Sequence, residues 1–412
     1  QLRFDLKIAL LLLLAQQQHE IDYQKTENQK IVSIVVFNLI FYSFLHLNPF
    51  VSVGEFIYNN STTIYLIVWS FLIYFAGKHL SSKFFIIYFA VFQLIYWKSV
   101  DAGFLEFKPI ATPLGISFFT FQGLTYLFAR MKLPEKNPEQ HIDEPWGFWK
   151  IFAFIGFFPT VLSGPIMRAK HWENCIKEPI ILTQKIFSKA MTWIAIGCFY
   201  KLCISSYFHD YVTMAFANPI DETGINILIG MFSYTFEIYH DFAGYSLMAI
   251  GIALLLGFNI AENFKQPYLS KNIRDFWQRW HISFSFWLRD YFYISTLGGS
   301  KKGEFRHVLN TFIVMVVCGA WHGISGNYLA WGLMHAFAVV LFHLTKNKIN
   351  LPFFVSWLMT FIYVSFAWVF FRAPDFNTGL VFIERLFQFD AWTHELNFHD
   401  YFMLSIFFIV FG

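Results

Sequence analysis

Two histidines stand among aromatic residues, where an imidazole group could do acid–base chemistry. His281 lies in the segment FWQRWHIS at 276–283, and His322 lies in the segment WHG at 321–323. An imidazole titrates near neutral pH, so it can take a proton from a hydroxyl group that attacks an acyl carbon. A histidine at the end of an apolar run is also a common hydrogen-bonding link between helices. The residues alone leave both roles open for His322, and we expect His335, in the next run, to have a packing role.

The composition of the chain that carries these histidines indicates a membrane protein. Of the 412 residues, 56% are hydrophobic, 22% are aromatic and 14% are charged, and the mean hydropathy is +0.47. So many apolar side chains cannot form an ordinary water-exposed surface, so we expect a polytopic membrane protein in contact with membrane lipid. The net charge of +3 is small, and we expect no nucleic-acid partner. The cysteines lack metal-ligand spacing, which predicts buried free thiols and no metal site; they are Cys175, Cys198, Cys203 and Cys318.

Eleven apolar runs predict an all-α bundle of transmembrane or partly spanning helices. A straight span needs about 20 apolar residues, but several runs are shorter, and Pro113, Pro159 and Pro165 interrupt others. Broken helices are tolerated in a membrane mainly where they line a cavity. We treat 1–412 as a single membrane-embedded domain, expected to be incomplete at both ends, where the runs 8–15 and 401–412 are short. The eleven runs are 31–47, 63–76, 84–97, 116–128, 148–162, 186–204, 225–239, 242–258, 308–320, 328–344 and 353–371.

Basic residues concentrate in one loop and predict the orientation of the chain. Residues 261–306 carry eight Lys and Arg against four Asp and Glu. Loops rich in Lys and Arg stay on the cytoplasmic side of a membrane. We therefore expect 261–306 and the basic connection 164–189 on that side, and the acidic connection 390–400 on the outer side.

An aromatic stripe in the basic loop predicts one amphipathic helix at the membrane surface. The aromatic residues recur at steps of three and four, which places them on one helical face, with the arginines mostly elsewhere. Two roles stay open: anchoring among lipid headgroups, or binding of a phosphate-bearing cytosolic donor by the arginines. The stripe consists of Trp277, Trp280, Phe284, Trp287 and Tyr291, and the arginines are Arg274, Arg279 and Arg289.

Three polar residues sit at the junction of two apolar runs. Glu237, His240 and Asp241 are three and four residues apart, which places them near one helical face. They could line a funnel or carry protons, or they could lock two helices together as a satisfied polar cluster. Asp241 is therefore kept as a supporting site residue.

Several of these segments together resemble the membrane-bound O-acyltransferase (MBOAT) family. The strongest are NIRDFWQRWHIS at 272–283, WLRDY at 287–291, the glycine pair 298–299 and WHG at 321–323. The segment 277–283 is more similar to the bacterial branch that O-acetylates polysaccharides than to the branch that adds D-alanine to teichoic acids. Further segments of the resemblance are PLGISF at 113–118, FP at 158–159, SGPI at 163–166, DFAGYS at 241–246 and WVFFRA at 368–373.

The resemblance implies an MBOAT-type bundle with interfacial helices and a central funnel that passes an acyl group from a cytoplasmic donor to an outer acceptor. His322 matches the catalytic histidine of the family, and His281 matches a second histidine associated with activity. The donor would be acetyl-CoA, with no permanently bound cofactor. The remaining site residues expected are Arg274, Trp277, Arg279, Trp280, Arg289 and Trp321 at the donor or funnel, and Asp241 and Asn327 in support.

The activity implied is O-acetylation of a cell-envelope polysaccharide by a multi-pass protein of the bacterial inner (cytoplasmic) membrane, with peptidoglycan as the first acceptor. The acetyl group would reach the acceptor directly or through a periplasmic or surface SGNH-type partner. The alternatives are alginate O-acetylation, D-alanyl transfer to teichoic acid from a carrier protein and, in a different class, a solute transporter or flippase. The sequence shows no inverted repeat of the kind many transporters have.

Overall fold

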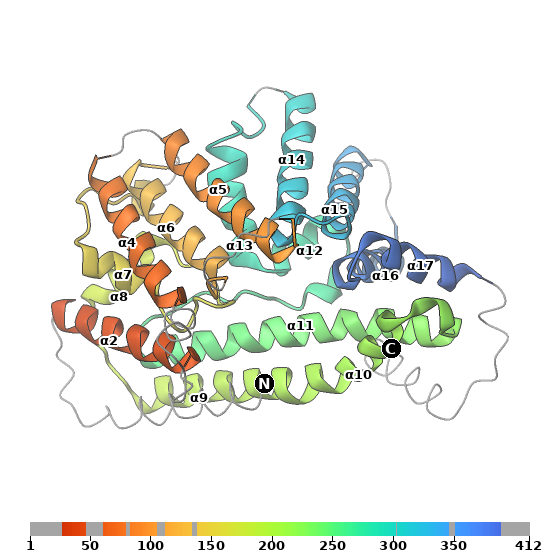
Figure 1. Ribbon diagram of the computed structural model, residues 1–412, viewed down its shortest axis with the longest axis horizontal. Helices are drawn as coiled ribbons and strands as arrows, with labels where there is room; N and C mark the ends of the chain where they lie inside the picture. The colour runs from red at the N-terminus through yellow and green to blue at the C-terminus, as the bar shows by residue number, and fades with distance from the viewer. Residues whose placement is uncertain are drawn as a thin grey trace. The chain divides into compact units, whose positions relative to one another are not determined.

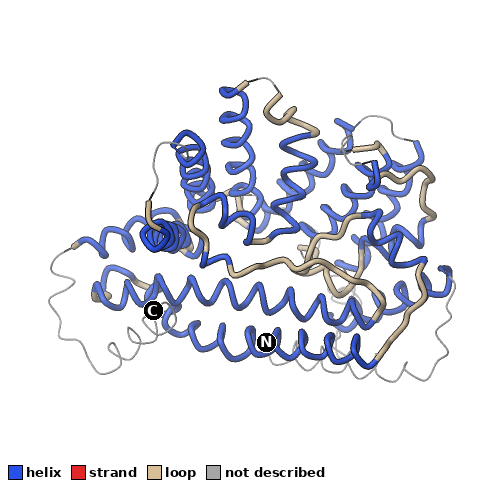
Figure 2. Tube along the Cα trace, turned by 180° about the vertical axis from the view of Figure 1, so that it is seen from behind, coloured by secondary structure: helices blue, strands red, loops and turns tan. Residues whose placement is uncertain are grey.

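The computed structural model describes seven stretches of the chain: 27–46, 61–79, 83–104, 112–133, 138–301, 303–345 and 351–388. Every regular element within these stretches is a helix, as Figure 2 shows. The prediction of an all-α fold is confirmed. The apolar runs 8–15 and 401–412 and the acidic connection 390–400 lie outside the described residues.

The apolar runs correspond to helices whose order is shown in Figure 1. The α-helices are α2 (Glu27–His46), α4 (Ser61–His79), α5 (Lys83–Asp101), α6 (Ile116–Arg130), α7 (Phe148–Ile155), α8 (Ala169–Lys177), α9 (Gln184–Cys198), α10 (Ser206–Ala217), α11 (Gly224–Leu255), α12 (Ile273–Arg279), α13 (Ile282–Trp287), α14 (Glu304–His322), α15 (Gly326–Thr345), α16 (Phe353–Arg372) and α17 (Phe376–Phe387). Two π-helical segments, Phe199–Ser205 and Leu288–Ile294, and three short 3₁₀ turns, Pro138–Gln140, Pro219–Asp221 and Pro267–Leu269, complete the described elements.

Three of the described helices are long and apolar enough to cross a membrane: α11, α15 and α16. The expected number of eleven spans is not confirmed. One expectation is wrong, because the runs 225–239 and 242–258 form the single helix α11. His240 and Asp241, at the junction, do not break a helix when their polar groups have partners. The His240 ring contacts the Phe236 carbonyl at 2.8 Å, and Asp241 pairs with Lys201.

By its internal contacts the chain divides into two compact units, each described by itself. Of the described residues, unit 1 comprises those up to Ile196 with Ser246–Asn263 and Phe286–Thr296, and unit 2 comprises Gly197–Tyr245, Phe264–Ser285 and those from Leu297 onward. In unit 1 the short helix α7 is buried from Ile151 to Ile155, whereas Trp149 in its first turn is exposed. It ends before Gly156 and Pro159, so the run 148–162 is interrupted, as its proline predicts.

The predicted amphipathic helix of the basic loop is wrong in two respects. It is divided, because α12 ends at Arg279, His281 adopts a left-handed φ of 43°, and a new helix starts at Ile282. Its aromatic stripe is also buried in protein: Trp280 is 4% exposed and Phe284 1%. Anchoring among lipid headgroups is therefore not the role of the stripe. In unit 1, Trp287 packs on Phe121 and donates a hydrogen bond to Thr125 at 2.9 Å.

The cysteines are all free thiols. Cys175 and Cys318 are buried, as expected. Cys198 is half-buried and Cys203 is exposed, so the expectation of buried thiols fails for Cys203. Both lie at or within the π-helical segment that follows α9, where the helix has a different side-chain spacing.

Candidate active site

His322 is the last residue of α14, at the point where the chain turns toward α15. Gly323 follows it in an extended conformation, with φ −175° and ψ 155°. The half-buried imidazole of His322 lies among aromatic rings. The ring centroids of Trp321, Phe371 and Trp331 are 4.4, 4.7 and 5.3 Å away. Side chains of α15 and α16 therefore surround the ring of His322 at the helix end.

Close packing of α14 against α15 sets the position of this helix end. Figure 1 shows the two helices side by side, joined by a short turn. Gly319 lies one turn before His322, and a Cβ added there would be 2.6 Å from the Tyr328 carbonyl oxygen and 2.9 Å from the Gly332 Cα. Only glycine allows two helix backbones to approach this closely. The glycine pair thus places His322 relative to α15.

A layer of tryptophans extends from His322 to α12. The Trp331 ring stacks on Trp368 with centroids 5.5 Å apart, and Trp368 lies 5.0 Å from Trp280. Trp277 lies 5.9 Å from Trp331 and 5.1 Å from His335, so the fully buried His335 is packed among rings, as expected. Offset or tilted aromatic pairs add to the stability of such a layer. The predicted residues Trp277 and Trp280 are therefore joined to the surroundings of His322.

His281 is joined to His322 by a second chain of rings. The His281 ring lies 5.0 Å from Phe284, which lies 4.5 Å from Trp321, the neighbour of His322. His281 is 2% exposed and stands between α12 and α13, outside the three candidate spans. Burial lowers the pKa of His281 to about 3, so its imidazole is neutral at neutral pH. The structure brings the two predicted histidines into one aromatic network of unit 2.

Asn327 holds the start of α15 against the end of α16. Its side-chain amide is 1% exposed and donates a hydrogen bond to the Ala373 carbonyl at 2.8 Å. Because α16 carries Phe371 two residues earlier, this bond helps to place a ring that contacts His322. Asn327 therefore links α15 to α16 close to His322, and its supporting role at the site stays a prediction.

The three predicted arginines have different surroundings. Arg279 pairs with Asp275 at 2.8 Å within α12. Arg289 belongs to unit 1 and pairs with Asp290 at 2.7 Å. Arg274 is exposed and forms no ion pair with another described residue. Of these three arginines, Arg274 is the one whose charge is not paired with a described carboxylate.

The supporting residue Asp241 pairs with Lys201 of the first π-helical segment. Glu237, which was grouped with it, instead contacts His209 of α10 at 2.8 Å. The polar residues of α11 therefore act as separate links to α10 and to the segment before it, which favours the helix-locking role.

Sequence reasoning missed two polar groupings. In unit 1 the buried Asp290 pairs with Arg168 at 2.6 Å as well as with Arg289. In unit 2, Glu304 at the start of α14 contacts His343 near the end of α15. The available signal for the second grouping was the prediction of two consecutive helices with a short turn, which brings the start of one to the end of the other.

Comparison with known proteins identifies the family of this chain. The family model described as MBOAT, membrane-bound O-acyltransferase family, matches residues 69–382. The chain belongs to this family. The MBOAT match includes His281, His322 and every other residue predicted for the site. With its apolar helices, the chain is a multi-pass membrane protein.

Individual MBOAT relatives point to the polysaccharide branch. The chain is 36% identical over 291 residues to a probable alginate O-acetylase AlgI of Pseudomonas putida, covering 70% of this chain and 58% of that protein. It is 31% identical over 313 residues to a peptidoglycan O-acetyltransferase of Helicobacter pylori, with coverage of 70% and 58%. It is 32% identical over 234 residues to a teichoic acid D-alanyltransferase of Bacillus subtilis, with coverage of 54% and 57%. The chain thus spans less than two thirds of the length of these relatives.

Proposed function

We propose that this chain is a membrane O-acetyltransferase that moves acetyl groups from cytoplasmic acetyl-CoA to hydroxyl groups of a polysaccharide outside the inner membrane. The observation that carries the proposal is the position of His322, held at the end of α14 among Trp331 and Phe371 in a chain of the MBOAT family. A titratable group held inside an aromatic membrane bundle is costly and is a functional candidate for that reason.

In the proposed reaction, neutral His322 acts as general base toward an acceptor hydroxyl. The imidazole takes the hydroxyl proton while the oxygen forms a bond to the acetyl carbon. The bond from that carbon to the thioester sulfur breaks, and the thiolate of CoA leaves and takes up the proton from His322. His281 is neutral because it is buried, so it supports the ring network without adding a fixed charge.

A second route uses the same step with a partner. The acetyl group would first reach a hydroxyl of a periplasmic or surface SGNH-type protein, which would then acylate the glycan. Both routes need the same base, so the role of His322 is common to them. Measurement with and without the partner separates the two routes.

For the acceptor, the relatives favour a polysaccharide over teichoic acid, since the two acetyltransferase types each cover 70% of this chain and the D-alanyltransferase covers 54%. The 36% identity to the alginate protein against 31% to the peptidoglycan protein makes alginate at least as strong a candidate as the peptidoglycan first expected.

The test is an acceptor and donor panel with purified protein in nanodiscs. Radiolabelled acetyl-CoA is supplied with peptidoglycan fragments or alginate, with and without a candidate SGNH-type partner, beside a D-alanyl carrier-protein donor. Label transfer from acetyl-CoA to one of the two glycans supports the proposal and names the acceptor. Transfer from the D-alanyl donor alone, or no transfer from any donor, contradicts it.

A further inference from the structure

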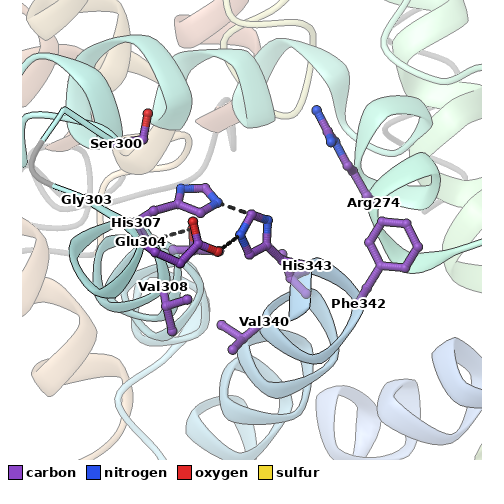
Figure 3. Close-up of a pocket in the computed structure, with 11 residues that line it drawn as sticks. Arg274, Ser300, Gly303, Glu304, His307, Val308, Val340, Phe342 and His343 are labelled. Carbon is purple, nitrogen blue, oxygen red and sulfur yellow. Dashed lines mark hydrogen bonds and ion pairs between the residues drawn. The ribbon is translucent and has the colours of Figure 1, made fainter. Parts of the chain in front are cut away.

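A cavity of about 600 Å³ lies in unit 2 at the start of α14, far from the helix end that carries His322. Its volume is in the range of sites for small molecules. In Figure 3, Arg274 reaches in from α12 on one side and Ser300 lies on the other, with Glu304, His307 and His343 between them. The other lining residues are Gly303, Val308, Thr311, Val339, Val340 and Phe342.

Two histidines and a carboxylate form a connected chain in this cavity. His307 Nε2 lies 3.3 Å from His343 Nδ1, and His343 Nε2 contacts the carboxylate of Glu304. The Glu304 and His307 side chains come from the first turn of α14, and His343 comes from the end of α15. Because Glu304 lies against Nε2 of His343, a protonated His343 donates from Nε2 to the carboxylate and from Nδ1 to His307.

Arg274 supplies the fixed positive charge of the cavity. Its guanidinium group forms no hydrogen bond or ion pair with another described residue, whereas the guanidinium of Arg279 on the same helix is paired with Asp275. A guanidinium group suits phosphate oxygens because it can donate two parallel hydrogen bonds. An arginine that lines a cavity together with two imidazoles therefore offers donors to an oxyanion.

We propose that this cavity binds a phosphate group, with Arg274 as its main contact and the His307–His343 pair as a proton-dependent second contact. The ligand class is a phosphate ester or diphosphate, and it can come from a nucleotide or from the headgroup of an anionic lipid. This inference goes beyond the proposed acetyl transfer, since it concerns binding and holds for either source.

Charge balance makes the binding depend on pH. The titratable and charged groups that line the cavity are Arg274 of α12, Glu304 and His307 of α14 and His343 of α15. With both histidines neutral, the charges of Arg274 and Glu304 cancel, and one proton on the histidine pair makes the cavity positive. A bound phosphate favours that proton, so binding takes up a proton and weakens as the pH rises.

The position of the cavity separates it from the acetyl-transfer step. Glu304 and His322 are the two ends of α14, a helix of 19 residues, so they lie about 27 Å apart along the helix axis. A phosphate held at Glu304 does not touch the ring of His322. Under the proposed function, a nucleotide phosphate bound here would anchor the distant end of an extended donor.

Equilibrium binding tests the proposal without any need for turnover. The full chain is placed in nanodiscs of phosphatidylcholine, and pyrophosphate and adenosine 3′,5′-bisphosphate are titrated by calorimetry in two buffers that differ in ionisation enthalpy. Arg274→Gln is compared with Lys271→Gln, which removes an exposed charge three residues away that does not line the cavity. His307→Gln tests the proton uptake. A parallel set of nanodiscs contains phosphatidylglycerol.

The expected result is binding that Arg274→Gln weakens about 10- to 100-fold and Lys271→Gln weakens less than about twofold. His307→Gln should remove most of the proton uptake. If the natural source is a lipid headgroup, phosphatidylglycerol should compete with the soluble probes in wild type but not in Arg274→Gln. Equal weakening by Arg274→Gln and Lys271→Gln overturns the proposal, and so does the lack of any effect of Arg274 in both sets of nanodiscs. Failure of acetyl transfer with intact Arg274-dependent binding would count only against the proposed function.

Discussion

Substitution of Gly319 by alanine should disturb the site without touching any ring in it. The added Cβ would lie 2.6 Å from the carbonyl oxygen of Tyr328 and 2.9 Å from the Cα of Gly332. Both atoms belong to the backbone of α15, so no side chain can rotate away. An ordinary contact needs a separation of 3.4 Å or more, so the helices must move apart locally by about 0.8 Å.

This displacement should cost stability and activity together. Overpacking of a close contact typically costs about 1–3 kcal/mol, and a misplacement of about 1 Å at a reacting group can lower a rate about 100-fold. His322 is three residues after Gly319, so we expect kcat to fall about 10- to 100-fold while the protein still inserts in the membrane.

The assay pairs thermal unfolding, followed by tryptophan fluorescence in nanodiscs, with acetyl transfer at saturating donor. The matched control is Ala320→Ser, which adds one heavy atom on an exposed position of the same helix and should leave both quantities near wild type. An unchanged unfolding temperature and unchanged kcat in Gly319→Ala would refute the argument that backbone contact places His322.

Two further predictions concern stability. Asn327→Ala should lower the free energy of unfolding by about 1–3 kcal/mol, because the buried Ala373 carbonyl loses its donor at 2.8 Å; denaturant titration checks this, and a change below about 0.5 kcal/mol would contradict it. Burial alone would raise the pKa of Glu173, but Lys170 and Lys150 at 2.9 and 3.3 Å lower it to about 2. This depressed pKa stabilises the fold above about pH 4.5, and the stabilisation is lost between pH 4.5 and 2. Glu173→Gln should flatten the unfolding temperature across that range, and an unflattened profile would show that other groups cause the acid transition.

The helical class and the place of His322 at the end of a helix could be predicted from the sequence. Apolar runs mark helices because a membrane leaves few other ways to satisfy the backbone. His322 stands at the end of its run, and the structure places it at the end of α14, among rings that the sequence marks by their aromatic type.

The break in the basic loop could not be predicted in this way. Steps of three and four between aromatic residues continue through Trp280 and Phe284, but His281 has a left-handed φ of 43° that no local residue type demands. Tertiary packing of His281 against Phe242 and Phe284 holds this conformation. Periodicity reports which face is apolar and does not report where a helix ends.

For the cavity at the start of α14, the sequence offered only the expectation that the start of one helix meets the end of the next. Glu304 and His343 are 39 residues apart and neither belongs to a motif. They meet because Gly319 and Gly332 let α14 and α15 pack closely along their length. The three arginines of the loop looked alike in sequence, and only the structure separates Arg274 from the paired Arg279 and Arg289.

The most direct test of the proposed function is acetyl transfer by His322→Ala and His322→Gln beside His335→Gln in nanodiscs. Radiolabelled acetyl-CoA turnover and label transfer to the glycan or partner are measured for each protein whose unfolding temperature is close to that of wild type. If His322 is the general base, both His322 variants lose at least about 100-fold in kcat, whereas His335→Gln retains most of its activity per folded molecule. Transfer at the wild-type rate by a folded His322 variant would contradict the central role assigned to this residue.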